Sequence, residues 1–155
     1  MTSGKQLLIL GPLLALLLLG CAKPVKPTIV ATTASTPDAV NAAVRVLSQH
    51  GLTVARVDEA AGVVVTDWQA TDFRYGQGPN GRDAFIVRRF TTTVSPRQGG
   101  SQVFVTVEDM KCEEPGLFVS GESGVHVGCV RVDGVVPPDQ TKVDAIGVDL
   151  DRELP

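Results

Sequence analysis

The strongest strand pattern in the chain is the stretch Asp-Ala-Phe-Ile-Val-Arg-Arg-Phe-Thr-Thr-Thr-Val, residues 83–94. Its apolar residues of one parity are Ala84, Ile86, Phe90 and Val94. Because successive side chains of a strand point to opposite faces, this alternation predicts a strand with one buried face.

A second strand is predicted directly after this one. Residues 96–100 read Pro-Arg-Gln-Gly-Gly, which is turn chemistry, and residues 102–110 carry Val103, Val105 and Val107 at alternate positions. We therefore expect 83–94 and 102–110 to pair as a long antiparallel hairpin.

A helix is predicted at residues 37–50. Thr36 suits the N-cap, Pro37 is favoured at the first helical position, and Gly51 suits a left-handed C-terminal cap. Val40, Val44 and Leu47 recur at helical spacing within it.

The segment after this helix predicts a hairpin and then a loop. The β-branched runs 52–58 and 62–69 are joined by a short turn containing Gly62. Residues 70–82 contain several glycines and a proline, which predicts a loop.

A second helix is predicted at the end of the chain, after Pro137-Pro138-Asp139. Val143, Ile146 and Leu150 form its apolar stripe, although Gly147 costs about 1 kcal/mol inside a helix. Together these elements predict a two-layer α+β domain over residues 36–155, with an antiparallel β-sheet packed by two amphipathic helices.

The start of the chain has the pattern of a secretory signal peptide, residues 1–20. Lys5 precedes the apolar run 7–19, which is shorter than the roughly 20 residues of a spanning helix. The end of the run and the two residues after it read Leu18-Leu19-Gly20-Cys21, which resembles the lipobox of bacterial lipoproteins.

That resemblance implies that the signal is cleaved before Cys21 and that Cys21 carries a diacylglycerol, often with a further acyl chain such as palmitate. Several acyl chains make membrane attachment effectively permanent. Ala22 after the cysteine, rather than Asp, implies the outer membrane, facing the periplasm. The alternative is an ordinary secretory signal cut after Ala22, which leaves a soluble protein.

Residues 21–35 are predicted to be the lipidated cysteine and an extended tether. Pro24 and Pro27 favour a polyproline conformation, in which this segment spans roughly 30–40 Å and lifts the domain off the bilayer. The alternative is that residues 28–31 pair as a short first strand.

Cys112 and Cys129 form an even pair in an exported chain, which predicts a disulfide. Two buried thiols are the alternative. Neither cysteine belongs to a paired metal-ligand spacing, so we expect no metal and no cofactor.

Charge and motifs exclude several classes of function. Without Lys5 the mature chain has 13 basic and 17 acidic residues (13 − 17 = −4), which gives no electrostatic reason to bind nucleic acid. The chain lacks Gly-x-Ser-x-Gly, Gly-Lys-Ser/Thr, Cys-x-x-Cys and His-Glu-x-x-His. We therefore expect a protein that is not an enzyme.

A second resemblance lies within residues 36–68. Thr36-Pro37-Asp38-Ala39, Gly51-Leu52-Thr53-Val54 and Gly62-Val63-Val64-Val65-Thr66-Asp67-Trp68 look like the start of helix-grip domains in envelope lipoproteins of the BamC type. It implies a helix-grip-like fold and a role in an envelope assembly.

The candidate recognition residues form an aromatic and basic group. They are Trp68, Phe73, Arg74, Tyr75, Arg82, Arg88 and Arg89. Because Trp, Tyr and Arg are enriched at interface hot spots, this group predicts a surface that binds a protein partner. The alternative is that Trp68 packs under the helices and the arginines only solubilise a strand.

We expect a membrane-anchored envelope lipoprotein that acts as a non-catalytic protein-interaction or assembly module. The alternative is a periplasmic carrier or sensor that encloses a small apolar ligand between its sheet and helices.

Overall fold

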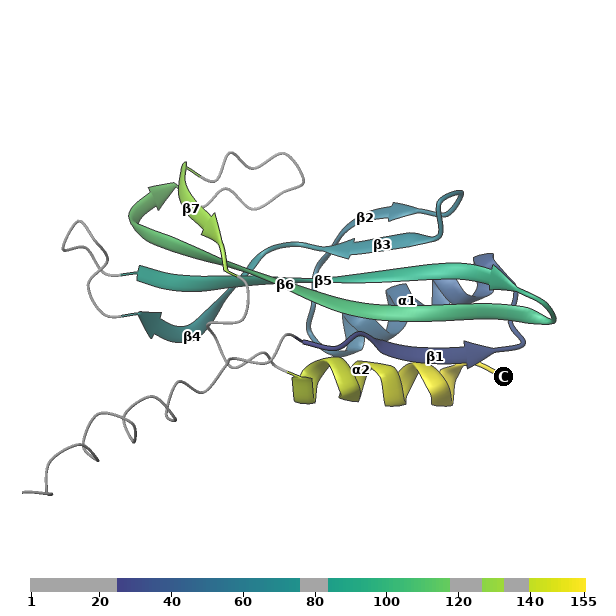
Figure 1. The fold of residues 1–155 in the computed structure, drawn as a ribbon. Coiled ribbons are helices and arrows are strands. Elements are labelled where there is room, and N and C mark those ends of the chain that lie inside the picture. Colours follow the sequence, from purple (N-terminus) through teal and green to yellow (C-terminus); the bar gives the residue numbers. More distant parts are fainter. Residues whose placement is uncertain (1–24, 76–83, 118–126, 133–139) are drawn as a thin grey trace, which may run out of the picture.

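The structure, a computed structural model, describes residues 25–75, 84–117, 127–132 and 140–155 (Figure 1). In chain order the elements are β1 (Thr28–Thr32), α1 (Thr36–Gln49), β2 (Val54–Asp58), β3 (Val63–Thr66), β4 (Gln69–Tyr75), β5 (Ala84–Arg97), β6 (Gly100–Leu117), β7 (Val127–Arg131) and α2 (Gln140–Glu153). The seven strands form one antiparallel sheet, which confirms the predicted α+β class. The predicted signal peptide, the predicted lipidation site Cys21 and the candidate recognition residue Arg82 lie outside the described residues.

The predicted long hairpin is present, and it is longer than expected. β5 pairs with β6 over its whole length, from Ala84 opposite Glu113 to Arg97 opposite Gly100. Only Gln98 and Gly99 remain for the turn, so Pro96, Arg97 and Gly100 belong to the strands rather than to the turn. Gly99 and Gly100 have φ values of 81° and 153°, which glycine adopts without a steric cost, and so the chain reverses tightly.

The other strands line the two edges of this hairpin. At one end the strand order is β1-β6-β5-β3-β2, and at the other end β4 pairs with β5 and β7 pairs with β6. The hairpin is therefore the shared axis of two half-sheets (Figure 1).

The prediction of a loop over residues 70–82 is wrong as far as Tyr75. These residues form β4, in which Ala70 lies opposite Val87 and Arg74 lies opposite Phe85, with a register shift between the two pairs. A strand with such an irregularity lacks the strict alternation on which the sequence prediction relied.

The stretch before α1 is also corrected. Of the two alternatives, the short first strand is present: Thr28–Thr32 pairs with β6, from Thr28 opposite Val105 to Thr32 opposite Ser101. Residues 28–32 therefore belong to the sheet and not to an extended tether, and the folded domain starts before residue 36.

The predicted helices are present, with one change of cap. The N-cap of α1 is Ser35 and not Thr36, because the Ser35 Oγ accepts a hydrogen bond from the Asp38 amide at 3.4 Å. Gly51 follows the helix with φ 73°, as the left-handed cap requires.

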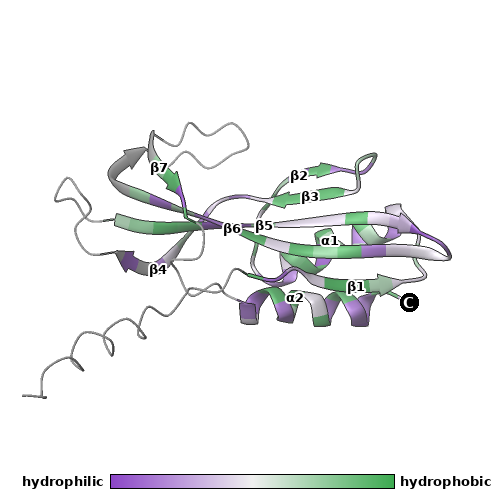
Figure 2. Ribbon diagram, in the orientation of Figure 1, coloured by the Kyte–Doolittle hydropathy of each residue, from purple (hydrophilic) through white to green (hydrophobic). Residues whose placement is uncertain are grey.

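Both helices share one buried cluster with the sheet. The helix residues of the cluster include Ala39, Val40, Ala43, Val46, Leu47, Val143, Ile146 and Leu150, and the sheet residues are Val30, Val64, Phe90, Val94, Val103 and Val105. The two helices therefore cover the same face of the sheet, at the end that carries β1 and β2 (Figure 2).

Gly147 explains how α2 approaches β1 so closely. A Cβ built on Gly147 would lie 2.3 Å from Thr28 Cγ2, which is inside the van der Waals limit. The glycine that weakens the helix locally is thus required by the packing of the helix against the first strand.

We predict that Gly147→Ala destabilises the protein by about 1–3 kcal/mol through overpacking. This loss outweighs the gain of about 1 kcal/mol in helix propensity. Adding Thr28→Ser removes the clashing methyl and keeps the hydroxyl, so the double variant should recover most of the loss in urea denaturation. A Gly147→Ala protein as stable as the wild type would contradict this packing.

Candidate functional site

The structure separates the predicted recognition residues into three places. Trp68 lies between β3 and β4, Phe73, Arg74 and Tyr75 lie in β4, and Arg88 and Arg89 lie in β5. Arg74 is exposed, and its guanidinium carbon is 5.7 Å from the centroid of the Phe85 ring. Among the members whose side chains the structure describes, Trp68 and Arg89 lie together, with the guanidinium carbon 4.6 Å from the Trp68 ring centroid.

Arg88 and Arg89 are both held by carboxylates on the neighbouring strand. Because they are consecutive in a strand, they point to opposite faces of the sheet. Arg88 makes a bidentate pair with Asp109, at 2.7 and 2.8 Å, and Arg89 donates to Glu108 Oε2 from Nε at 2.9 Å. Asp109 and Glu108 are their cross-strand partners in the β5–β6 register. Both arginines therefore have a structural role.

The Arg88–Asp109 pair is nearly buried, with each side chain 11% exposed. Removing one partner of such a pair leaves an uncompensated charge, so we predict that Asp109→Ala lowers the free energy of unfolding by about 3 kcal/mol. The double variant Arg88→Met, Asp109→Leu removes both charges and should regain most of that loss in the same denaturation assay. A loss below about 0.5 kcal/mol for Asp109→Ala would mean that the pair is solvated.

Trp68 belongs to a second buried cluster on the other face of the sheet. It is 6% exposed and clusters with Val87 and Cys112, and Cys129 packs against the same group. The interpretation that Trp68 fills a core is therefore supported, but its place under the helices is wrong. Register alternation puts Val87 and Phe90 on opposite faces of β5, so this cluster lies opposite the helices.

The predicted disulfide between Cys112 and Cys129 is present and joins β6 to β7. The two residues lie directly opposite each other, with Cα atoms 4.1 Å apart. A bridge closing 17 residues stabilises by roughly 3 kcal/mol in the chain-entropy model, so it holds the short strand β7 on the hairpin.

A row of side chains crosses the face that neither described helix covers. Register alignment places Val63, Thr93, Phe104 and Ile29 side by side across β3, β5, β6 and β1. The adjacent row, which includes Val64, Thr92 and Val105, is fully buried under the helices. Ile29 is 53% exposed, and Val63 and Phe104 are half-buried.

We call this surface the open face: Ile29, Val63, Thr93 and Phe104, together with the neighbouring Arg89, Glu108 and Arg131. Arg131 extends the charged part, because its Nη1 lies 3.4 Å from Glu108 Oε1 and its side chain is 67% exposed. Sequence reasoning missed Ile29 and Phe104. Ile29 and Phe104 occupy the alternate strand positions to the buried Val30, Val103 and Val105, so strand alternation could have placed them on the opposite face of the sheet.

Among the described residues, no group of three or more His, Cys, Asp or Glu side chains could hold a metal ion. His50 contacts Asp149 of α2, with Nε2 3.0 Å from Oδ2, and so links the two helices. Within the same residues, no helix has the length and apolar character needed to cross a membrane.

No protein-family model matches the chain, and a search of curated proteins finds no significant match.

Proposed function

We propose that this chain is a bacterial envelope lipoprotein, anchored through lipid on Cys21, whose domain is a non-catalytic protein-interaction module. The observation that carries the proposal is the open face, a sheet surface where the exposed Ile29 and the half-buried Val63 and Phe104 lie beside a charged cluster that is already ordered. Two helices on one face of an antiparallel sheet also fit the helix-grip arrangement of the resembled lipoproteins.

The anchoring part rests on the lipobox and agrees with the disulfide. Cys112 and Cys129 are bonded in the structure, and such bridges persist in oxidising, extracytoplasmic compartments. An exported chain with a cysteine directly after Leu-Leu-Gly fits a lipoprotein that faces the periplasm.

The binding part rests on the physical character of the open face. Ile29 and Phe104 offer apolar area that water covers in the free protein, and removing that area from water favours association. Arg89 is already fixed by Glu108 and Trp68, so its ordering adds little entropic cost on binding. A broad surface built from four strands suits a protein partner.

The alternative, a carrier of a small apolar ligand, has less support. The space between the helices and the sheet is occupied by one contiguous set of buried side chains, among them Leu47, Phe90 and Ile146. A ligand entering there would have to displace closely packed side chains, which carries a cost in free energy.

Lipid attachment is tested by Cys21→Ser. The wild-type protein should float with membranes, and its amino-terminal peptide should carry an acyl mass at Cys21. The variant should lose that mass and remain unprocessed or become soluble. A wild-type amino terminus at Lys23 without acyl mass would exclude the anchor.

Binding by the open face is tested with two matched variants. Ile29 and Val148 are exposed β-branched residues, at 53% and 49%, on β1 and on α2 respectively. We predict that Ile29→Glu removes the partners that co-purify from the native envelope, whereas Val148→Glu retains them. Both should unfold within about 0.5 kcal/mol of the wild type, as surface changes do. Equal partner recovery by both variants would exclude the open face.

A further inference from the structure

The residues just before β1 are clamped onto α2. The Lys26 amide donates to Gln140 Oε1 at 3.1 Å, and Gln140 Nε2 donates to the Lys26 carbonyl at 3.2 Å. Thr28 Oγ1 donates to Asp144 Oδ1 at 2.6 Å, and Val25 packs against the main core. The chain is therefore part of the folded body from Val25 onward.

The clamp is in place at neutral pH. Hydrogen bonds from Thr28 and Gln140 lower the pKa of Asp144 below its ordinary value of 3.8. A lowered pKa means that the contribution of this carboxylate is complete above pH 3.8 and is lost only as the pH falls through the lower, folded value. Asp144 is therefore ionised at neutral pH and can accept the hydrogen bonds from Thr28 and Gln140.

The free length between Cys21 and the body is short. Four residue steps separate Cys21 from Val25, and they reach at most about 14 Å in any conformation. The expected tether of roughly 30–40 Å is therefore replaced by a much shorter one, because residues 25–32 are bound to the domain.

This reach is smaller than the distances to the far parts of the domain. Thr28 is level with Thr92 of β5, and β5 continues for eight more residues to Ala84, about 26 Å at the usual strand rise. In the other direction, β5 runs five residues from Thr92 to Arg97 beside the hairpin turn, about 17 Å at the same rise. Four strand spacings separate β1 from β2, about 19 Å.

We infer that the lipidated protein lies on its side on the bilayer, with the edge formed by β1 and the first turn of α2 against the lipid headgroups. The long axis of the β5–β6 hairpin then runs along the membrane plane, and the β2 edge points away. This inference rests on the proposed lipidation of Cys21. Val25 precedes Thr28 by three residues, about 10 Å at most, on the side of Ala84. The Ala84 end is therefore at least about 16 Å from Val25 and the hairpin turn at least about 17 Å, and both distances exceed the reach of about 14 Å.

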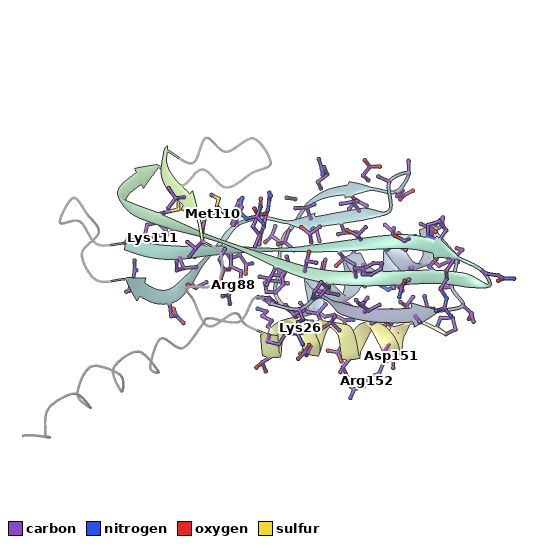
Figure 3. All side chains as sticks on the ribbon, in the orientation of Figure 1. Lys26, Arg88, Met110, Lys111, Asp151 and Arg152 are labelled. Atoms are coloured by element: carbon purple, nitrogen blue, oxygen red, sulfur yellow. A yellow bond between two sulfur atoms is a disulfide. The ribbon has the colours of Figure 1, made fainter. Side chains whose placement is uncertain are left out.

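The described side chains at this edge carry both signs of charge, the exposed Lys26 and the Asp144 carboxylate that Thr28 and Gln140 hold. Lys26 is exposed beside the start of α2, whereas Asp151 and Arg152 lie toward the other end of that helix (Figure 3). With the β1 edge on the bilayer, the sheet stands upright, and the open face looks sideways along the membrane. A partner docking on it would sit next to the domain at the same bilayer surface.

The orientation is tested by quenching in vesicles. A fluorescent amino acid is placed at Thr141, an exposed residue in the first turn of α2, or at Val57, which is 42% exposed on β2. The full-length protein, purified with its lipid, is inserted into phosphatidylethanolamine–phosphatidylglycerol vesicles whose headgroups carry a nitroxide quencher. Quenching at Thr141 should be several-fold stronger than at Val57.

A tether variant provides the control. Inserting a flexible Gly/Ser linker of about 15 residues after Pro24 should release the domain and remove most of the difference between the two sites. Equal quenching at both sites of the lipidated protein, or no effect of the linker, would overturn the orientation alone. Absence of acyl mass on Cys21 would overturn the proposed anchoring, and the orientation with it.

Discussion

The pairing of β5 with β6 is the interaction on which the rest of the structure depends. All 14 residues of β5 have a partner on β6, and the outer edges of the two strands hold β1, β3, β4 and β7. A slip of one residue would exchange the two faces of the sheet, burying Arg89 under the helices and exposing Phe90. The two-residue turn of Gln98 and Gly99 therefore sets the composition of both the core and the open face.

The sheet is covered on different faces at its two ends. At one end the helices bury the face that carries Phe90 and Val105. At the other end the opposite face carries the disulfide and the cluster of Trp68, Val87 and Cys112. The consecutive arginines of β5 and their carboxylate partners on β6 lie between the two clusters. Charged side chains are tolerated at this boundary because each is paired across the strands, with Arg88 and Asp109 almost buried.

The packing of α2 on β1 connects the fold with the proposed anchoring. Gly147 allows the helix to approach Thr28, and the same threonine bonds Asp144. The Gln140 side chain hydrogen-bonds both the amide and the carbonyl of Lys26. These bonds fix Lys26 to the domain, so fewer residues remain free between Cys21 and the folded part of the chain. A local packing requirement thus limits the distance between the domain and the membrane in the proposed lipid-anchored form.

Local patterns in the sequence were sufficient for the fold class, both helices, the two hairpins and the paired cysteines. Alternation in 83–94 and the capping residues around α1 reflect interactions between residues close in the chain, whereas the even cysteine pair is read from composition. Tertiary structure alone decided that 69–75 is a strand, that Trp68 packs opposite the helices, and that Arg88 and Arg89 are paired with Asp109 and Glu108. It also decided that Thr28–Thr32 joins the sheet. The reason is that strand edges and ion pairs depend on partners far away in the chain, whose register no local window contains.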